Sequence, residues 1–243
     1  MKWGVGTGRC GTKSLSIILG GVHEAVPFIQ DEAALYRDGS RDKAILQTLK
    51  RKLRKHYLRG LPAVDIQFSY VIPLIVEVDP DAEFVWAIRN PKDMVASAMH
   101  KNLYGRTLEN AVERWGRFGE FKLHLDKLRI RPKGDLWDKT SQLFRCYWYW
   151  VTVNKLIERD LSDKDYTVIF THQMGDVRAN KSLRPVKPLA SYKVDGSTWE
   201  YITKIVNPYW EELKEKYDGR ETYQKPHNVC RHHGWTAQDS PVP

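Results

Sequence analysis

The sequence predicts an α/β fold in which a central, mainly parallel sheet lies between two layers of helices. Short apolar runs of strand length, at 84–88 and 166–170, alternate along the chain with longer amphipathic segments, at 41–59 and 140–160. Near the start, a glycine-rich turn joins one apolar run to the next, in the order strand, turn, helix. Because helices cover both faces of a parallel sheet, this alternation favours a three-layer α/β/α sandwich.

The composition is that of one globular domain, expected over residues 1–243. No apolar run approaches the ~20 residues of a membrane span, and the first four residues do not resemble a signal peptide, so we expect a cytoplasmic protein. The net charge of +9 indicates an anionic ligand, an anionic acceptor or nucleic acid, or reflects solubility alone. Cys10, Cys146 and Cys230 have neither disulfide nor zinc-ligand spacing, so we expect no metal.

The glycine-rich turn comprises residues 6–15, with the sequence GTGRCGTKSL. Its three glycines allow a tight turn that brings backbone N–H groups close to a ligand. We expect the following helix to begin with Thr12 or Ser14 as a hydroxyl cap and to direct its positive end toward the same point. Arg9 and Lys13 add two cations. The turn therefore predicts a cradle for phosphate or sulfate.

Two features of this turn affect how its chemistry is interpreted. The nucleotide-triphosphatase pattern G-x-x-x-x-G-K-[ST] places lysine directly after its last glycine, whereas here Thr12 separates Gly11 from Lys13. Cys10 lies where neighbouring N–H groups and cations could lower its pKa and make it a nucleophile. We favour the other interpretation, in which Cys10 is a small residue that fits the turn.

Two carboxylates are candidate catalytic bases. Glu24 follows the first expected helix, and it is either such a base or an exposed turn residue. Asp65 lies near the end of a short buried strand expected at 63–66, and ligands of open parallel sheets bind at the carboxyl ends of the strands. Between them, the expected helix 41–59 has an apolar face and a basic face, which we interpret as solvated rather than as a surface for polyanions.

A second informative segment covers residues 84–100. Its first five residues are all apolar, as in a buried parallel strand, and Arg89 emerges at the carboxyl end of that strand. We expect Asn90 to cap the next helix and Pro91 to occupy its first position. Ser97 lies two turns into this helix, so Ser97 and Arg89 can converge on one anion.

The later part of the chain continues the alternation of strands and helices. The expected helix 140–160 carries aromatic residues at 147–150, which line an acceptor pocket or, as we favour, pack in the core. The expected strand 166–170 lacks the terminal acidic residue with which phosphate-transferring nucleotidases hold magnesium. The remaining expected segments are a helix at 107–128, a loop at 176–197, a helix at 198–216 and a basic tail at 225–234.

Two of these motifs together resemble the sulfotransferase family. Residues 6–15 resemble its 5′-phosphosulfate loop, commonly G-x-x-[RK]-[ST]-G-T-[ST], and residues 89–100 (RNPKDMVASAMH) closely resemble its 3′-phosphate motif, R-x-P-x-D-x-x-x-S. The resemblance covers roughly the first 100 residues. It implies a P-loop nucleotide-hydrolase-like fold and metal-free transfer of a sulfuryl group from 3′-phosphoadenosine 5′-phosphosulfate (PAPS) to a hydroxyl or amine.

The resemblance also implies roles for individual residues. Arg9 matches the loop cation that contacts the transferring group and the leaving phosphate, and Arg89 and Ser97 match the residues that bind the 3′-phosphate. The residues implied to wrap the 5′-phosphate are Gly8, Arg9, Cys10, Gly11, Thr12, Lys13 and Ser14. Cys10 and Lys13 each stand where the family commonly has a hydroxyl residue.

The small-molecule branch of the family uses a histidine base in a lysine–threonine–histidine context between the two motifs, and that context is missing here. Other branches use a carboxylate, which is therefore the base that the resemblance implies. Asp65 falls where the carbohydrate-modifying branch of the family has its glutamate, and Glu24 falls nearer to the position used by tyrosyl-protein sulfotransferases. We favour Asp65 slightly. The acceptor is expected to be a small molecule, a carbohydrate or another hydroxyl-bearing compound rather than nucleic acid, and the sequence leaves the oligomeric state open. The alternative functions are a P-loop kinase or nucleotidase, and a module that binds a nucleotide or polyanion without turnover.

Overall fold

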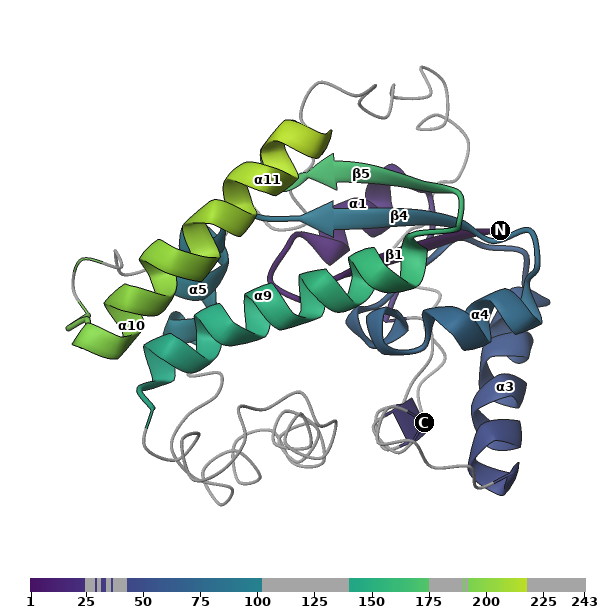
Figure 1. Cartoon of the computed structure of the whole chain (residues 1–243). Helices are drawn as coiled ribbons and strands as arrows, with labels where there is room; N and C mark the ends of the chain where they lie inside the picture. The colour runs from purple at the N-terminus through teal and green to yellow at the C-terminus, as the bar shows by residue number, and fades with distance from the viewer. Residues whose placement is uncertain are drawn as a thin grey trace, which may run out of the picture.

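The chain forms an α/β structure around a five-stranded parallel sheet (Figure 1). A computed structural model describes residues 1–24, 29, 32–33, 36, 43–101, 140–174, 190 and 192–217. The strand order is β2-β3-β1-β4-β5. The strands are β1 (Lys2–Gly6), β2 (Val22–His23), β3 (Ala63–Val64), β4 (Glu83–Ile88) and β5 (Tyr166–Phe170). The parallel sheet expected from the sequence is therefore confirmed.

Helices lie on both faces of this sheet (Figure 1). Helix α1 (Thr12–Ile18) packs on one face, against a small core that includes Leu15, Val85 and Ala87. The other face carries the larger core. The helices that contribute to the larger core are α3 (Lys43–Tyr57), α4 (Ile72–Val78), α5 (Pro91–His100), α9 (Gln142–Leu161) and α11 (Asn207–Tyr217).

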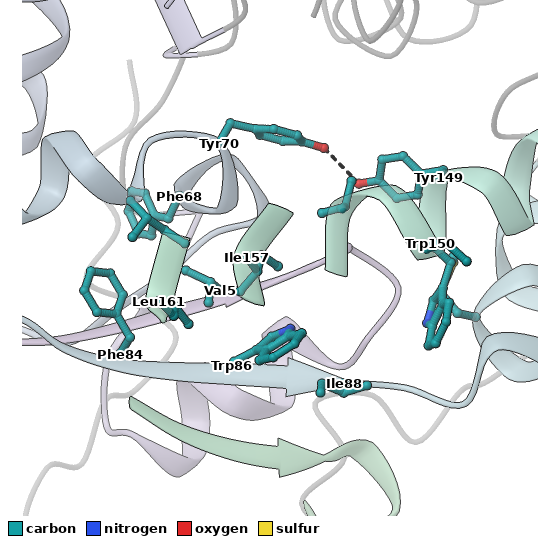
Figure 2. Close-up of a cluster of buried hydrophobic side chains, with 14 of the residues drawn as sticks. Val5, Phe68, Tyr70, Phe84, Trp86, Ile88, Tyr149, Trp150, Ile157 and Leu161 are labelled. Atoms are coloured by element: carbon teal, nitrogen blue, oxygen red, sulfur yellow. Dashed lines mark hydrogen bonds between the residues drawn. The ribbon is translucent and has the colours of Figure 1, made fainter. Parts of the chain in front are cut away.

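Side-chain alternation along the strands divides the two cores. On β4, Phe84, Trp86 and Ile88 face the larger core, to which Ile157 and Leu161 of α9 also belong (Figure 2). The intervening Val85 and Ala87 face α1. Because both sides of the strand are buried, its sequence is apolar throughout, which is why β4 could be predicted from composition alone.

Local sequence signals account for the ends of several elements. Asn90 caps α5, with its side-chain oxygen 2.9 Å from the Lys92 N–H, and Pro91 occupies the first helical position, as expected. The strand expected at 63–66 is shorter, because Asp65 leaves the ladder and instead caps the 3₁₀ turn η1 (Ile66–Tyr70).

The helix expected at 198–216 is present with one irregularity. Helix α10 (Gly196–Tyr201) continues through a π-helical turn, η4 (Ile202–Val206), into α11. The N–H of Asn207 reaches back five residues to the carbonyl of Ile202. Pro208 follows and has no N–H for a regular helical hydrogen bond, so the wider turn precedes the position at which the α-helical ladder would be interrupted.

The aromatic residues 147–150 of α9 are buried in the larger core, in agreement with the packing interpretation. The helix expected at 107–128 and the basic tail at 225–234 lie outside the described residues, as does most of the loop at 176–197. Among the described residues, no helix has both the length and the apolar character required to cross a membrane.

Candidate functional site

The candidate site lies at the carboxyl edge of the sheet, around the end of β1. The chain leaves β1 for β2 at one edge of the sheet and later returns to β4 on the other side of β1, so the direction of the connections reverses there. Open α/β sheets bind ligands at such a reversal, beyond the carboxyl ends of the strands. The glycine-rich turn, Asp65 and Arg89 follow β1, β3 and β4 directly, and they therefore come to this edge together.

The turn after β1 has an unusual backbone. Gly8, Arg9 and Gly11 have positive φ angles of 71°, 55° and 89°. Glycine adopts such angles freely, whereas for Arg9 this conformation is strained. Turns in tight conformations can present N–H groups in a concavity suited to an anion. The positive φ angles agree with the expected cradle, whereas the N–H groups of Gly8 and Cys10 hydrogen-bond to the Cys10 thiol.

The first helix is capped differently from the sequence expectation. Its N-cap is Gly11, without a side-chain hydrogen bond, so the prediction of a hydroxyl cap from Thr12 or Ser14 was wrong. A hydroxyl cap requires an extended backbone at the cap residue, whereas Gly11 is left-handed. Thr12 is buried and Ser14 partly buried in the first turn, and Lys13 is exposed.

Cys10 is a packed residue of the turn. Its side chain is fully buried, and this burial raises the pKa of its thiol. A Cβ placed on Gly6 would lie 2.5 Å from the Cys10 sulfur and 2.9 Å from the Ala87 carbonyl oxygen, so the glycine makes room for the cysteine. These observations favour the small-residue interpretation of Cys10 over the nucleophile, because a buried thiol with a raised pKa is unreactive.

Three hydroxyl groups hold the turn from behind. Ser69 bonds to both the N–H and the carbonyl of Gly6, each at 2.9 Å. Tyr149 of α9 donates to the Thr7 carbonyl at 2.7 Å, and its hydroxyl lies 3.1 Å from that of Tyr70 (Figure 2). Thr171, directly after β5, donates to the Cys10 carbonyl at 2.8 Å. Sequence reasoning missed Ser69 and Thr171, and it took Tyr149 only as one of the aromatic residues 147–150, because each hydroxyl acts through a contact distant in sequence.

The two motifs singled out in the sequence meet here. Arg9 Nε donates to Ser97 Oγ at 2.9 Å, although the residues are 88 positions apart. Arg89 donates to the Arg9 carbonyl at 2.9 Å, and its own carbonyl accepts from the Trp150 indole at 2.9 Å. Partial burial of the guanidinium group and the nearby charge of Arg89 lower the pKa of Arg9. Two cations held this close would both gain from a bound anion.

The two carboxylates lie at the ends of neighbouring strands. Asp65 follows β3 and is fully buried; one carboxylate oxygen accepts the Gln67 N–H at 2.9 Å, and the other has no hydrogen-bond partner. Burial, opposed by that hydrogen bond and reinforced by the charge of Glu24, raises the pKa of Asp65 to about 7. Glu24 follows β2, is exposed and has a positive φ of 54°.

A histidine that the sequence reasoning did not single out touches the turn. His23 ends β2, and its Nε2 lies 3.1 Å from Thr12 Oγ1. Burial of the ring is the main effect that lowers the pKa of His23; Glu24 raises it and Lys13 lowers it further. The only sequence signal was its position before Glu24, after the first helix.

No group of three or more metal-ligating side chains occurs among the described residues. Comparisons of the chain with protein-family models, with curated proteins and with solved structures gave no match. Conclusions about activity therefore depend on the geometry of the site.

Proposed function

We propose that this protein is a sulfotransferase of P-loop-like fold that moves a sulfuryl group from PAPS to a hydroxyl or amine of an acceptor. The observation that carries the proposal is the 2.9 Å hydrogen bond between Arg9 and Ser97. It joins the segment that resembles a 5′-phosphosulfate loop to the segment that resembles a 3′-phosphate motif. One nucleotide with anionic groups at both ends would satisfy both segments at once.

The residues around this contact suit such a ligand. The strained turn at 8–11 offers backbone N–H groups, and Arg9 and Arg89 offer forked cations that match phosphate and sulfate oxygens. On this proposal, Ser97 and Arg89 bind the 3′-phosphate, while Arg9 and the turn bind the 5′ end. The acceptor is a small molecule, a carbohydrate or another hydroxyl-bearing compound.

The charges fit the chemistry of the transfer. As the bond between sulfur and the 5′-phosphate oxygen breaks, negative charge collects on the departing phosphate. Arg9 and the backbone N–H groups of the turn stabilise that charge, because they are already oriented before the reaction begins. Arg9 remains a cation throughout and does not supply the proton chemistry.

The proposal is tested first by ligand-dependent stability. Adenosine 3′,5′-bisphosphate is expected to raise the melting temperature clearly, and ATP with magnesium much less. Equal increases in melting temperature with the two ligands would contradict the assignment of Arg89 and Ser97 to a 3′-phosphate and would favour a P-loop kinase or nucleotidase. Binding without transfer of labelled sulfate from PAPS to any member of a panel of phenols, alcohols, sugars and amines would favour a non-catalytic binding module.

Arg89 provides the sharpest single substitution. Arg89→Ala is expected to weaken binding of adenosine 3′,5′-bisphosphate by about 10- to 100-fold, since hydrogen bonds to charged groups contribute about 1.5–3 kcal/mol. Isothermal titration calorimetry measures the change. Lys92→Ala, at an exposed position in the first turn of α5, the helix that begins two residues after Arg89, is the matched control and should bind as the wild type does. Equal affinity in both variants would argue against the role of Arg89.

A further inference from the structure

Helix α3 has a buried side and a basic side. Leu49 and Leu53 are fully buried in the larger core. The opposite side of the helix is exposed and continues into the turn that follows Tyr57. It carries four cations at intervals of three and four residues, which places them together on the helix surface. This basic face comprises Arg51, Arg54, Lys55 and Arg59.

The basic face lacks acidic neighbours. Residues 43–62 contain neither aspartate nor glutamate. Lys50, at one margin of the face, forms an ion pair with Glu77, and Lys52, at the other margin, forms one with Glu32. By contrast, no carboxylate lies within ion-pair distance of the basic face among the residues that the structure describes. Because like charges one turn apart repel, these four cations would gain from an anionic partner.

Two exposed leucines adjoin the basic face. Leu58 is 77% exposed and Leu61 is 47% exposed. Leu58 follows Arg54 by four residues, so it lies on the same side as the cations. The turn that carries Leu61 is held in place by His56, whose Nε2 lies 3.2 Å from the Leu61 carbonyl oxygen. The sequence alone favoured a solvated face, because it does not show that both leucines remain exposed.

We propose that the basic face, together with Leu58 and Leu61, docks on the surface of an anionic lipid bilayer. Cations on an amphipathic helix bind anionic headgroups, while neighbouring apolar side chains enter the boundary between the headgroups and the acyl chains. A nucleic acid would also attract the four cations, but it has no apolar phase for the two leucines to enter. The leucines therefore favour the bilayer. This inference stands apart from the proposed transfer reaction and does not depend on it.

The docking surface lies away from the candidate site. The ring of His56 on α3 contacts that of Trp3, near the start of β1, with 5.7 Å between the ring centroids. The glycine-rich turn instead follows the end of β1, and Figure 1 shows α3 toward the amino ends of the strands. A protein docked through α3 would therefore keep the carboxyl edge of its sheet open to solvent.

The first test measures binding of the full chain to lipid vesicles by sedimentation. The protein should bind vesicles of phosphatidylcholine with phosphatidylserine but not vesicles of phosphatidylcholine alone, and added salt should weaken binding by screening the charges. Arg54→Gln with Lys55→Gln should weaken binding by about 30-fold, the effect of two cations at an anionic bilayer. Lys193→Gln with Lys204→Gln, at exposed positions outside α3, loses the same charge and should bind as the wild type does. Equal losses in both double variants would show that net charge alone attracts the protein, and would overturn the proposal.

The second test separates a bilayer from a polyanion. Leu58→Ser with Leu61→Ser keeps every charge, and because both positions are exposed, circular dichroism should show the variant folded. It should bind the phosphatidylserine vesicles about 10-fold more weakly than the wild type. Equal vesicle binding by the two proteins would overturn the proposal, as would a wild type that binds no vesicles. Binding of single-stranded polyuridylate in place of vesicles, measured by fluorescence anisotropy, would assign the basic face to nucleic acid.

Discussion

At the scale of single residues, Arg9 combines a strained backbone with a guanidinium group directed at the second motif. Its φ of 55° lies in the left-handed region, where a non-glycine residue costs about 1–3 kcal/mol. Neighbouring hydrogen bonds maintain this conformation, among them that from Arg89 to the Arg9 carbonyl. Strain of this kind collects at functional sites, because the surrounding structure must impose it.

The backbone and side-chain contributions of Arg9 can be separated. Arg9→Gly should leave the unliganded protein at least as stable as the wild type, since glycine adopts this φ without strain, yet it should weaken binding of adenosine 3′,5′-bisphosphate. Arg9→Ala should weaken binding equally while keeping the strain, so Arg9→Gly should be the more stable variant by about 1 kcal/mol. Chemical denaturation and calorimetry measure the two effects. A glycine variant less stable than the alanine variant would contradict this account.

Asp65 makes a prediction about pH. Its folded-state pKa of about 7 is above the ordinary value of 3.8, so between roughly pH 4 and 7 the folded protein binds more protons than the unfolded one. Stability should therefore fall as pH rises through this range, by at most about 1.4 kcal/mol per pH unit from this group. Asp65→Asn should remove that part of the slope. Urea denaturation of both proteins from pH 4 to 8 provides the comparison, and identical slopes would show that Asp65 does not titrate in this range.

At the scale of elements, α9 connects the turn to the rest of the molecule. Its first half carries Tyr149 and Trp150, which donate to the carbonyls of Thr7 and Arg89. Both residues look like core aromatics in the sequence, and both are buried. Their polar atoms nevertheless fix the backbone on either side of the site, which is why burial alone does not describe what they do.

Tyr149→Phe tests this connection. Loss of the hydroxyl that bonds to the Thr7 carbonyl at 2.7 Å should lower the free energy of unfolding by about 1–2 kcal/mol and weaken binding of adenosine 3′,5′-bisphosphate. Tyr166→Phe removes a comparable hydroxyl contact, to Tyr217 at 2.9 Å, at the start of β5. That control should lose stability without losing affinity. Equal affinities in both variants would show that the Tyr149 hydroxyl of α9 does not support nucleotide binding at the site.

The elements themselves could largely be predicted from the sequence, whereas their contacts could not. The apolar run of β4, the cap at Asn90 and the periodicity of α9 are local signals, and the structure agrees with each. The contact between Arg9 and Ser97 follows from the parallel pairing of β1 with β4. The prediction of a hydroxyl cap at Thr12 was wrong because Gly11, whose backbone is left-handed, occupies the cap position. The contact between His23 and Thr12 depends on the pairing of β2 with β3, and a two-residue strand has no clear sequence pattern.

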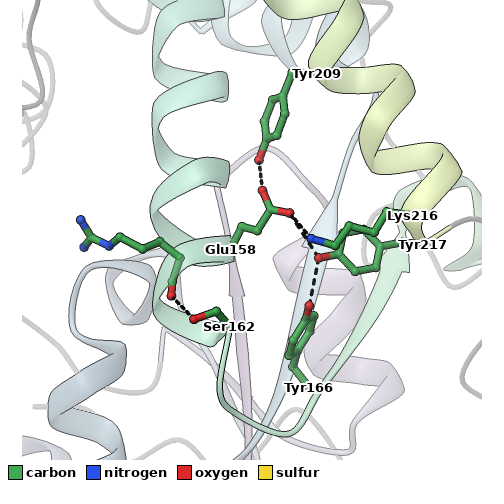
Figure 3. Close-up of polar contacts among 7 residues, drawn as sticks. Glu158, Ser162, Tyr166, Tyr209, Lys216 and Tyr217 are labelled. Atoms are coloured by element: carbon green, nitrogen blue, oxygen red, sulfur yellow. Dashed lines mark hydrogen bonds and ion pairs between the residues drawn. The ribbon is translucent and has the colours of Figure 1, made fainter.

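At the scale of the whole molecule, the two ends of α9 have different tasks. Glu158 lies nine residues beyond Tyr149, about 13 Å along the helix axis. Its carboxylate accepts hydrogen bonds from Tyr209 and Tyr217 and forms an ion pair with Lys216 (Figure 3). An open cavity of about 590 Å³ adjoins this cluster. The cluster ties α11 to α9, remote from the glycine-rich turn, so it supports the fold rather than the candidate site.

Substitution of Glu158 should therefore affect stability alone. Glu158→Leu is expected to lower the free energy of unfolding by about 1–3 kcal/mol, because it removes the shared acceptor of three side chains, and to leave the affinity for adenosine 3′,5′-bisphosphate unchanged. Glu200→Gln, which breaks an exposed ion pair with Lys204, is the control and should be as stable as the wild type. A loss of affinity in Glu158→Leu would show that the two ends of α9 are coupled.

The hydrogen bonds behind the turn have a consequence for how the protein is made. The glycine-rich turn and the segment 89–100 are both complete once residue 101 has been synthesised, but the carbonyls of Thr7, Arg89 and Cys10 receive these hydrogen bonds only from Tyr149, Trp150 and Thr171. A ribosome-bound chain of the first hundred residues thus holds the motifs without the groups that fix them. If the proposed function holds, the nascent protein should bind adenosine 3′,5′-bisphosphate only late, after Thr171 has left the exit tunnel.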